Sequence, residues 1–173
     1  MILIGLGANL ERETGEKPAE TLREALDLFP EKGLRVEACS PFYASRPVPA
    51  SDQPWFVNAV ASIDCDFGPE EVLSALLAVE SAFGRVRKDK NEARVIDLDL
   101  LDFKGEIRPE RETWGKNGGE GLILPHPRLH ERLFVLKPLA DIAPGWVHPV
   151  LGLPVRDLID AMGKAQKLRV LEA

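Results

Sequence analysis

The sequence predicts an α+β protein with a ferredoxin-like βαββαβ core, an antiparallel sheet and extra C-terminal helices. The main observation is the order of patterns, in which strand-like apolar runs and two amphipathic helical patterns follow one another as strand, helix, strand, strand, helix, strand. The chain has 173 residues, 45% of them hydrophobic, which is enough for one domain with a sizeable core. No repeat or linker divides it, so we expect a single domain over residues 1–173.

Four strands and two helices make up this predicted core. Apolar runs of strand length place the strands at 1–6, 34–43, 56–65 and 95–103. The helices are marked by apolar residues at helical spacing; Pro18 opens the first and Gly68-Pro69 the second, and Gly33 and Gly84 stand where they end. A proline-rich loop over 44–54 separates the second strand from the third.

The remainder of the chain lies outside the βαββαβ pattern. Residues 104–121 are polar and Gly-rich without apolar periodicity, so we expect a long loop or a disordered excursion that carries Trp114. Leucines 129, 133, 136 and 139 indicate a further helix, and residues 154–162 predict a final one.

Composition excludes several classes of protein. A pI of about 5.2 argues against a general nucleic-acid binder, and the chain has no apolar run long enough to cross a membrane. The first residues lack the basic region of a signal peptide, so we expect a cytoplasmic protein. We also expect a monomer. Cys39 and Cys65 have no metal-ligand spacing and are interpreted as buried free thiols.

The most informative stretch is Arg94-Val-Ile-Asp-Leu-Asp-Leu-Leu-Asp102. Side chains alternate along a strand, so Asp97 and Asp99 point to the same side with Cα atoms roughly 7 Å apart. Two such carboxylates repel each other unless a cation lies between them, and hard oxygen ligands suit Mg²⁺, which usually also carries substrate phosphates. The pattern therefore suggests a metal site, although an Asp-x-Asp pair alone is more often the solvated face of a half-buried sheet.

A basic segment precedes this strand. Residues 85–94 hold five basic and two acidic side chains, a local charge of +3 in a chain of net charge −6. Arg85, Arg87 and Arg94 can neutralise triphosphate oxygens, so the segment and the carboxylate pair together suggest a polyphosphate site. We further expect the segment 85–94 to be mobile without ligand and to become ordered with Mg-ATP.

Five segments in this order resemble 6-hydroxymethyl-7,8-dihydropterin pyrophosphokinases, a family of the folate pathway. They are Gly5-Leu-Gly-Ala-Asn-Leu10, Asp52-Gln-Pro-Trp-Phe-Val-Asn-Ala-Val60, Glu80 with Gly84-Arg-Val-Arg87, Arg94-Val-Ile-Asp-Leu-Asp99, and Leu124-Pro-His-Pro-Arg-Leu-His-Glu-Arg-Leu-Phe-Val135. The resemblance implies transfer of pyrophosphate from ATP to the pterin's hydroxymethyl oxygen, with attack on the β-phosphorus and release of AMP. It also implies two Mg²⁺ ions, held here by Asp97 and Asp99.

The resemblance assigns roles to matching positions. Arg85 and Arg94 join the two aspartates as catalytic residues. ATP would meet Arg85, Arg87, Arg94, His126 and Arg132. The pterin would meet Ser45, Val48, Phe56, Asn58 and Phe134, with the two phenylalanines on either side of the ring. Glu80 would orient Asn58 or a basic side chain, or lie solvated on its helix.

Two departures from the family pattern and two alternatives stay open. Residues 90–94 lack the tryptophan that closes over the pterin in the family, for which Trp114 could substitute or else pack on the protein body. Ser45-Arg46 stands where the family often has Thr-Pro. The alternatives are another Mg²⁺-dependent nucleotidyl or phosphoryl transferase, which needs no ring slot, and a ferredoxin-like binding module, which needs no carboxylate pair.

Overall fold

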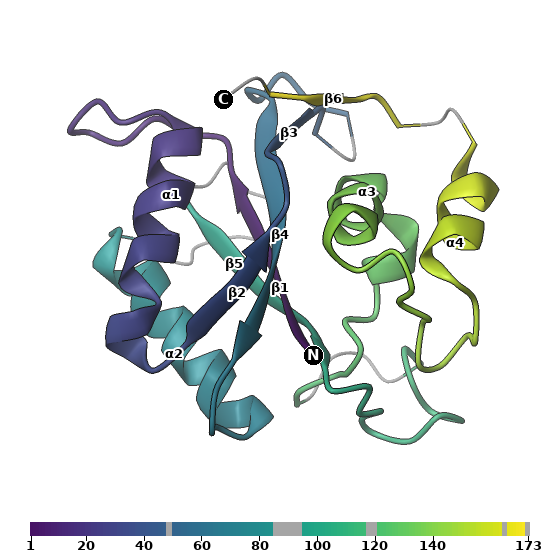
Figure 1. Ribbon diagram of the computed structural model, residues 1–173. Helices are drawn as coiled ribbons and strands as arrows, with labels where there is room; N and C mark the ends of the chain where they lie inside the picture. The colour runs from purple at the N-terminus through teal and green to yellow at the C-terminus, as the bar shows by residue number, and fades with distance from the viewer. Residues whose placement is uncertain (48–49, 85–94, 117–120, 164–165, 172–173) are drawn as a thin grey trace.

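The protein is a three-layer structure with one sheet between two pairs of helices (Figure 1). It is described by a computed structural model for residues 1–47, 50–84, 95–116, 121–163 and 166–171. The helices are α1 (Pro18–Leu28), α2 (Pro69–Ala82), α3 (Leu133–Ile142) and α4 (Val155–Met162). Figure 1 shows α1 and α2 on one side of the sheet and α3 and α4 on the other.

The sheet contains six strands in the part of the chain that is described. They are β1 (Ile2–Ala8), β2 (Arg35–Cys39), β3 (Tyr43–Ser45), β4 (Phe56–Asp64), β5 (Asp97–Phe103) and β6 (Leu168–Val170). Their order is β5-β1-β4-β3-β6, with β2 also paired to β4, and every pair is antiparallel. The order of the predicted core strands confirms the ferredoxin-like arrangement.

Local sequence signals set the ends of the first two helices. Each has proline at its first position, where the missing N–H removes a donor that would have no partner in the helix. Glu20 and Glu71 accept the backbone N–H groups of Lys17 and Gly68, which precede the helices. Gly84 follows the end of α2, and Gly33 ends the 3₁₀ turn over Pro30–Lys32 that comes after α1; their positive φ angles of 75° and 77° are a conformation that glycine adopts without strain.

Two hydrophobic clusters lie on opposite faces of the sheet. The larger one packs alternate residues of β1, β4 and β5 against α1 and α2. The smaller one joins Leu3, Val60 and Leu101 to α3 and α4. On this second face the apolar side chains of β1 give way to Gly5 and Gly7, so the sheet is left open there beside α3.

The structure corrects several expected boundaries. The predicted strand 34–43 is split into β2 and β3, because Pro41 cannot donate a ladder hydrogen bond. The helix expected from Leu129 begins only at Leu133, after a short 3₁₀ turn over Leu129–Glu131. No sequence pattern indicated β6. Cys65 is buried as expected, but Cys39 is exposed on β2, which contradicts the expectation for that thiol.

The excursion after β5 is tied to the protein body over its described part. The Trp114 indole donates Nε1–H to the carbonyl of Pro125 at 2.9 Å, and its ring lies 5.6 Å from that of His130 and 5.3 Å from that of His148. Arg111 donates to the carbonyls of Pro149 and Val150. Packing on the body is therefore the confirmed alternative for Trp114.

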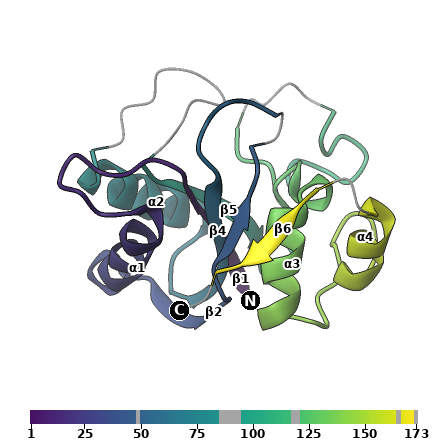
Figure 2. The same cartoon turned by 90° about the horizontal axis from the view of Figure 1, so that it is seen from above.

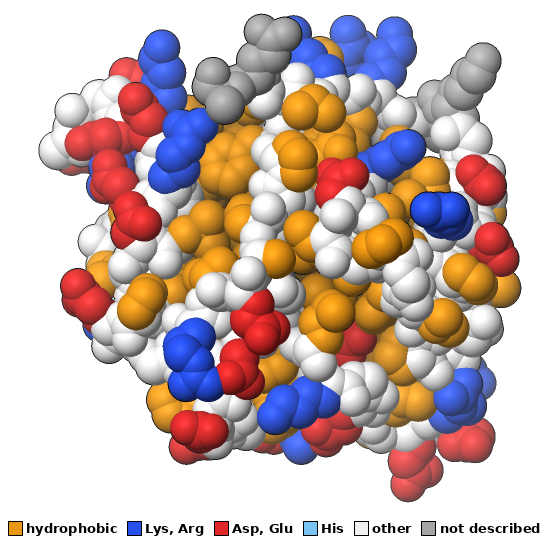
Figure 3. All heavy atoms as spheres, in the orientation of Figure 1, with side chains coloured by type: hydrophobic (Ala, Val, Ile, Leu, Met, Phe, Trp, Pro, Cys, Tyr) orange, Lys and Arg blue, Asp and Glu red, His pale blue; other side chains and the backbone are white. Residues whose placement is uncertain are grey.

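The described residues include no helix long and apolar enough to cross a membrane. On the face shown in Figure 3, acidic side chains are frequent on the side of α1, and basic ones gather at the upper edge, in the region of β3 and β6.

Candidate active site

The candidate site is a pocket on the second face of the sheet, beside the first turn of α3. Its floor includes Gly5 and Gly7 of β1, whose missing side chains let a ligand approach the backbone closely. A side chain at Gly7 would stand 3.5 Å from Oδ1 of Asn58, and one at Gly5 would stand 3.3 Å from Leu101. Both glycines line the pocket, so a side chain at either position would take up part of its space.

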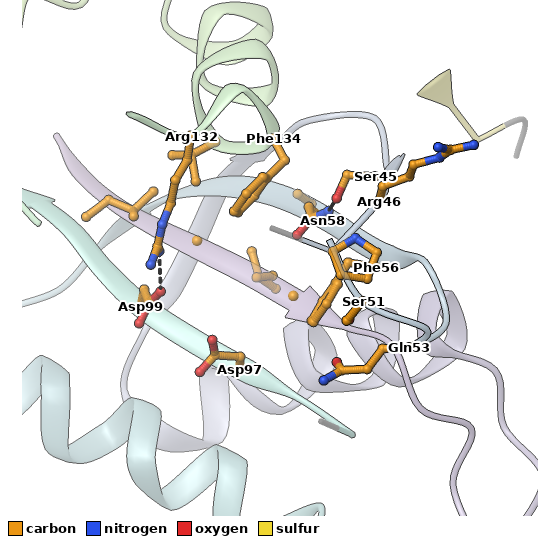
Figure 4. A pocket seen from close by; sticks show the side chains of 17 residues that line it. Ser45, Arg46, Ser51, Gln53, Phe56, Asn58, Asp97, Asp99, Arg132 and Phe134 are labelled. Carbon is orange, nitrogen blue, oxygen red and sulfur yellow. Dashed lines mark hydrogen bonds and ion pairs between the residues drawn. The ribbon is translucent and has the colours of Figure 1, made fainter. Parts of the chain in front are cut away.

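Asp97 and Asp99 line one end of the pocket from the edge strand β5. Asp97 lies opposite Gly7 and Asp99 opposite Gly5, so both carboxylates rise from the same face beside the glycine floor (Figure 4). This confirms the same-face prediction. Arg132, the residue before α3, places its Nη1 3.5 Å from Oδ2 of Asp99.

The other end of the pocket is lined by aromatic and buried polar side chains. Phe56, at the start of β4, and Phe134, in the first turn of α3, both line it. Asn58 and Ser45 are only 5% and 4% exposed, and the Asn58 amide donates to the Ser45 hydroxyl at 2.8 Å. The structure therefore brings together four of the residues assigned to the pterin from segments far apart in the sequence.

Described residues of the segment between β3 and β4 form the rim of this end. Arg46, Pro47, Ser51 and Gln53 line the pocket. The buried Asn9 amide donates to the Gln53 side chain at 3.2 Å and to the Pro54 carbonyl at 3.3 Å. Figure 4 shows the guanidinium of Arg46 turned away from the pocket, so in this structure Arg46 lines it with other atoms.

His126 lies outside the set of pocket-lining residues but close to the charged end. Burial lowers its pKa to about 4, and the positive charge of Arg132 acts in the same direction while Asp97 opposes it. Nδ1 of the ring accepts the backbone N–H of Arg128 at 3.1 Å. The imidazole is therefore neutral near pH 7 with its proton on Nε2, so it could donate a hydrogen bond but supplies no positive charge.

Glu80 is a residue whose place in the site could not be read from the sequence. It is 2% exposed, and its Oε1 accepts the backbone N–H of Leu98 at 2.7 Å. Leu98 is the residue between Asp97 and Asp99, so α2 holds the peptide that carries both carboxylates. A solvated Glu80 is thus excluded. The only signal was its helical spacing from the apolar stripe of α2, which does not distinguish a buried carboxylate from an exposed one.

Some predicted residues lie outside the described part of the chain. These are Val48 and the three arginines Arg85, Arg87 and Arg94, together with the expected mobility of 85–94. The described residues contain no group of three or more His, Cys, Asp or Glu side chains placed to hold a metal ion. A two-carboxylate site is compatible with that finding.

Comparison with known proteins decides the family. Residues 3–144 match the family described as 7,8-dihydro-6-hydroxymethylpterin-pyrophosphokinase (HPPK). The chain belongs to this family. The match ends before α4 and β6.

Related sequences agree with this assignment. The chain is 39% identical over 145 residues to the 2-amino-4-hydroxy-6-hydroxymethyldihydropteridine pyrophosphokinase of Methylorubrum extorquens, covering 83% of both proteins. It is 37% identical over 154 residues to the folic acid synthesis protein fol1 of Pneumocystis carinii, covering 89% of this chain but only 19% of that protein. The chain therefore spans about a fifth of the length of that larger relative.

A solved structure with a similar fold is the wild-type Plasmodium falciparum HPPK-DHPS with pteroate. The TM-score is 0.68 with 16% identity, over 92% of this chain and 44% of that chain. At this identity the likeness supports the fold alone, and it agrees with the ferredoxin-like core.

Proposed function

We propose that the protein transfers pyrophosphate from ATP to the hydroxymethyl oxygen of 6-hydroxymethyl-7,8-dihydropterin, giving the pterin diphosphate and AMP. The observation that carries this proposal is one pocket in which a ring slot adjoins a same-face carboxylate pair. A phosphoryl transferase without a pterin substrate would have no use for the slot. A simple binding module would have no use for the carboxylates beside it.

The ring slot would orient the acceptor. Phe56 and Phe134 would take the two faces of the pterin, since both line the slot from different elements. Asn58 would meet the amide-like edge of the ring with a side chain already fixed by Ser45. Phosphoryl-type transfer depends chiefly on positioning and charge neutralisation, so holding the hydroxymethyl group near the phosphates is itself catalytic.

Asp97 and Asp99 would hold Mg²⁺. Mg²⁺ in nucleotide sites is commonly bound by one or two carboxylates, with substrate phosphates and water completing its coordination, so this donor set fits the ion. Bound there, two Mg²⁺ ions would neutralise charge on the attacking and leaving oxygens of an in-line displacement. The chain's own contribution is to fix both carboxylates on one strand face, with Glu80 holding the peptide between them.

Cationic side chains would complete the ATP site. Arg132 borders Asp99 and can reach a phosphate oxygen with a second N–H of its guanidinium. Neutral His126 would donate its Nε2–H. Arg85, Arg87 and Arg94 are proposed for the remaining phosphate oxygens on the family resemblance alone.

The test is product identity. Purified protein is mixed with Mg-ATP and 6-hydroxymethyl-7,8-dihydropterin, and the nucleotides are separated. AMP, formed only when the pterin is present, is the expected product. ADP as the main product would refute the pyrophosphokinase reaction and favour a phosphotransferase. Absence of turnover with tight pterin binding would favour the binding module.

A further inference from the structure

Residues 166–170, which we call the strap, lie between α4 and β3 and include β6, the strand at this edge of the sheet (Figure 1 and Figure 2). At its start, the Gln166 side chain makes two hydrogen bonds to one short stretch of backbone. Its Nε2 donates to the carbonyl of Glu131 at 3.0 Å, and its Oε1 accepts the N–H of Leu133 at 3.0 Å. These two peptide groups flank Arg132.

The two bonds define the orientation of the Gln166 amide. A backbone N–H can only donate and a backbone carbonyl can only accept, so exchanging the amide's oxygen and nitrogen would lose both bonds. Leu133 is the first residue of α3, and its N–H is one of the donors that a helix cannot satisfy internally. Arg132 itself has extended backbone angles and no side-chain cap. Gln166 thus caps α3 from a distant part of the chain and fixes the backbone that carries Arg132.

The other end of the strap reaches the opposite wall of the pocket. Strand β6 pairs with β3, with Leu168 opposite Ser45. The Arg169 guanidinium lies 5.0 Å from the ring centroid of Trp55, and the Arg46 guanidinium lies 5.4 Å from the same ring. Trp55 immediately precedes Phe56, which is paired with Ser45 across β3 and β4.

Two arginines and one tryptophan therefore form a clamp, which joins Arg169 of β6 to Arg46, the residue after β3, and Trp55, the residue before β4. Each guanidinium–indole contact is attractive because the ring face is negative, and its strength depends on both partners staying in place. The contacts fix the two ends of the β3–β4 loop, next to Ser45 and Phe56, which line the pocket. Basic side chains gather along this edge of the molecule (Figure 3).

We propose that the strap is a positioning element of the substrate pocket, in which Gln166 sets Arg132 for the nucleotide and Arg169 sets the β3–β4 hairpin for the pterin. The inference rests on the proposed function and deepens it. The strap lies beyond the residues that match the family, 3–144, so it adds to the pocket from a part of the chain that the family pattern does not cover.

The first experiment separates the two ends of the strap by ligand. Dissociation constants are measured for a non-hydrolysable ATP analogue with Mg²⁺, and for the pterin at saturating analogue. Gln166→Met removes both hydrogen bonds while keeping the length of the side chain. It should raise the dissociation constant of the ATP analogue roughly 3- to 10-fold. Gln166→Glu keeps an acceptor for Leu133, so it should lie between Gln166→Met and wild type.

The second arm concerns the clamp. Arg169→Ala should raise the dissociation constant of the pterin about 2- to 5-fold and leave that of the ATP analogue unchanged. Trp55→Ala should raise the dissociation constant of the pterin further. Adding Arg169→Ala to Trp55→Ala should change this constant little, because the two residues act through one contact. Lys167→Ala, at an exposed strap residue, and Arg23→Ala, which removes a guanidinium contact with Phe42 at 5.2 Å, are the matched controls and should bind both ligands normally.

The outcomes distinguish this inference from the proposed function. Strap variants that lower Tm but bind both ligands as wild type does would reduce the strap to a purely structural role and overturn the inference. The same holds if Gln166→Met and Arg169→Ala impair the two ligands equally. Failure of the wild-type protein to release AMP would instead refute the proposed reaction, whatever the strap variants bind.

Discussion

The two ends of the pocket reach their geometry in different ways. The ring end is fixed by groups that satisfy one another inside the fold: Asn58 and Ser45 are buried and hydrogen-bonded at 2.8 Å. At the charged end, Asp97 and Asp99 are only partly buried, and the Arg132 guanidinium lies 3.5 Å from the Asp99 carboxylate. A neutral ring can meet a preformed slot, whereas charged groups can remain hydrated until a charged ligand replaces their water.

Removal of either carboxylate is the strongest test of this contrast. Asp97→Ala and Asp99→Ala should each lower kcat by at least about 100-fold, because each aspartate would supply several kcal/mol of charge stabilisation through the metal. The pterin should still bind, since its slot lies at the other end. Steady-state AMP release and pterin binding are the measurements, with exposed Asp27→Ala as the control. Near-normal kcat in either variant would remove the metal role.

A change at the ring end should have the opposite signature. Asn58→Ala deletes the polar contact with the ring edge and should raise KM for the pterin roughly 10-fold or more, with KM for ATP nearly unchanged. Ser45→Ala only frees the Asn58 amide from one partner and should have a smaller effect in the same direction. Initial rates with each substrate varied separately decide the matter. An equal rise in both KM values would show that the two ends are not independent.

Glu80 belongs to the charged end although it lies beneath it. Glu80→Leu removes the acceptor for the Leu98 N–H and should lower kcat by about 10-fold, together with Tm, because a buried donor loses its partner next to both aspartates. Glu80→Gln keeps an oxygen at that position and should recover most of the activity. The comparison of kcat in the two variants checks this. If Glu80→Leu turns over normally, the aspartates do not depend on this hydrogen bond.

Trp114 should contribute to the stability of the fold and not to the binding of a ligand at either end of the pocket. Trp114→Ala removes contacts with His130 and His148 and leaves the Pro125 carbonyl without its donor. A loss of about 1–3 kcal/mol in the free energy of unfolding is expected, with both KM values unchanged. Chemical denaturation and kinetics measure the two quantities. A raised KM for the pterin alone would instead place this tryptophan on the substrate.

His148, which packs against Trp114, should make the stability of the protein depend on pH. Burial and the neighbouring His130 lower its pKa to about 4, below the ordinary value of 6.5. The unfolded chain therefore takes up a proton at higher pH than the folded one. The contribution of His148 to the free energy of unfolding is complete above pH 6.5 and is lost as the pH falls toward 4. The slope for one histidine is at most about 1.4 kcal/mol per pH unit. Denaturant titrations from pH 4 to 7 should show that the free energy of unfolding depends less steeply on pH in His148→Phe than in the wild-type protein.

Much of the fold followed from local signals, and the reasons can be named. Pro18 and Pro69 mark helix starts by their missing N–H, Gly84 marks the end of α2 by its positive φ, and Gly33 marks the end of the 3₁₀ turn that follows α1. The alternation of side chains along 95–103 is enough to place both aspartates of β5 on one face. Strand β6 has only three residues and no marked pattern, because its pairing with β3 is decided by a neighbour far away in the sequence.

The sequence by itself determined the core order, the carboxylate pair and, through ordered motifs, the family. The tertiary structure alone decided which partners those residues have. Gln166 beside Arg132, Arg169 beside Trp55 and Glu80 beneath Leu98 are contacts between distant segments, and Trp114 packs away from the pocket. Local patterns report periodicity and turn preference, which are properties of neighbouring residues. Long-range contacts depend on how whole elements pack, so the same glutamine or glutamate could equally have been solvated.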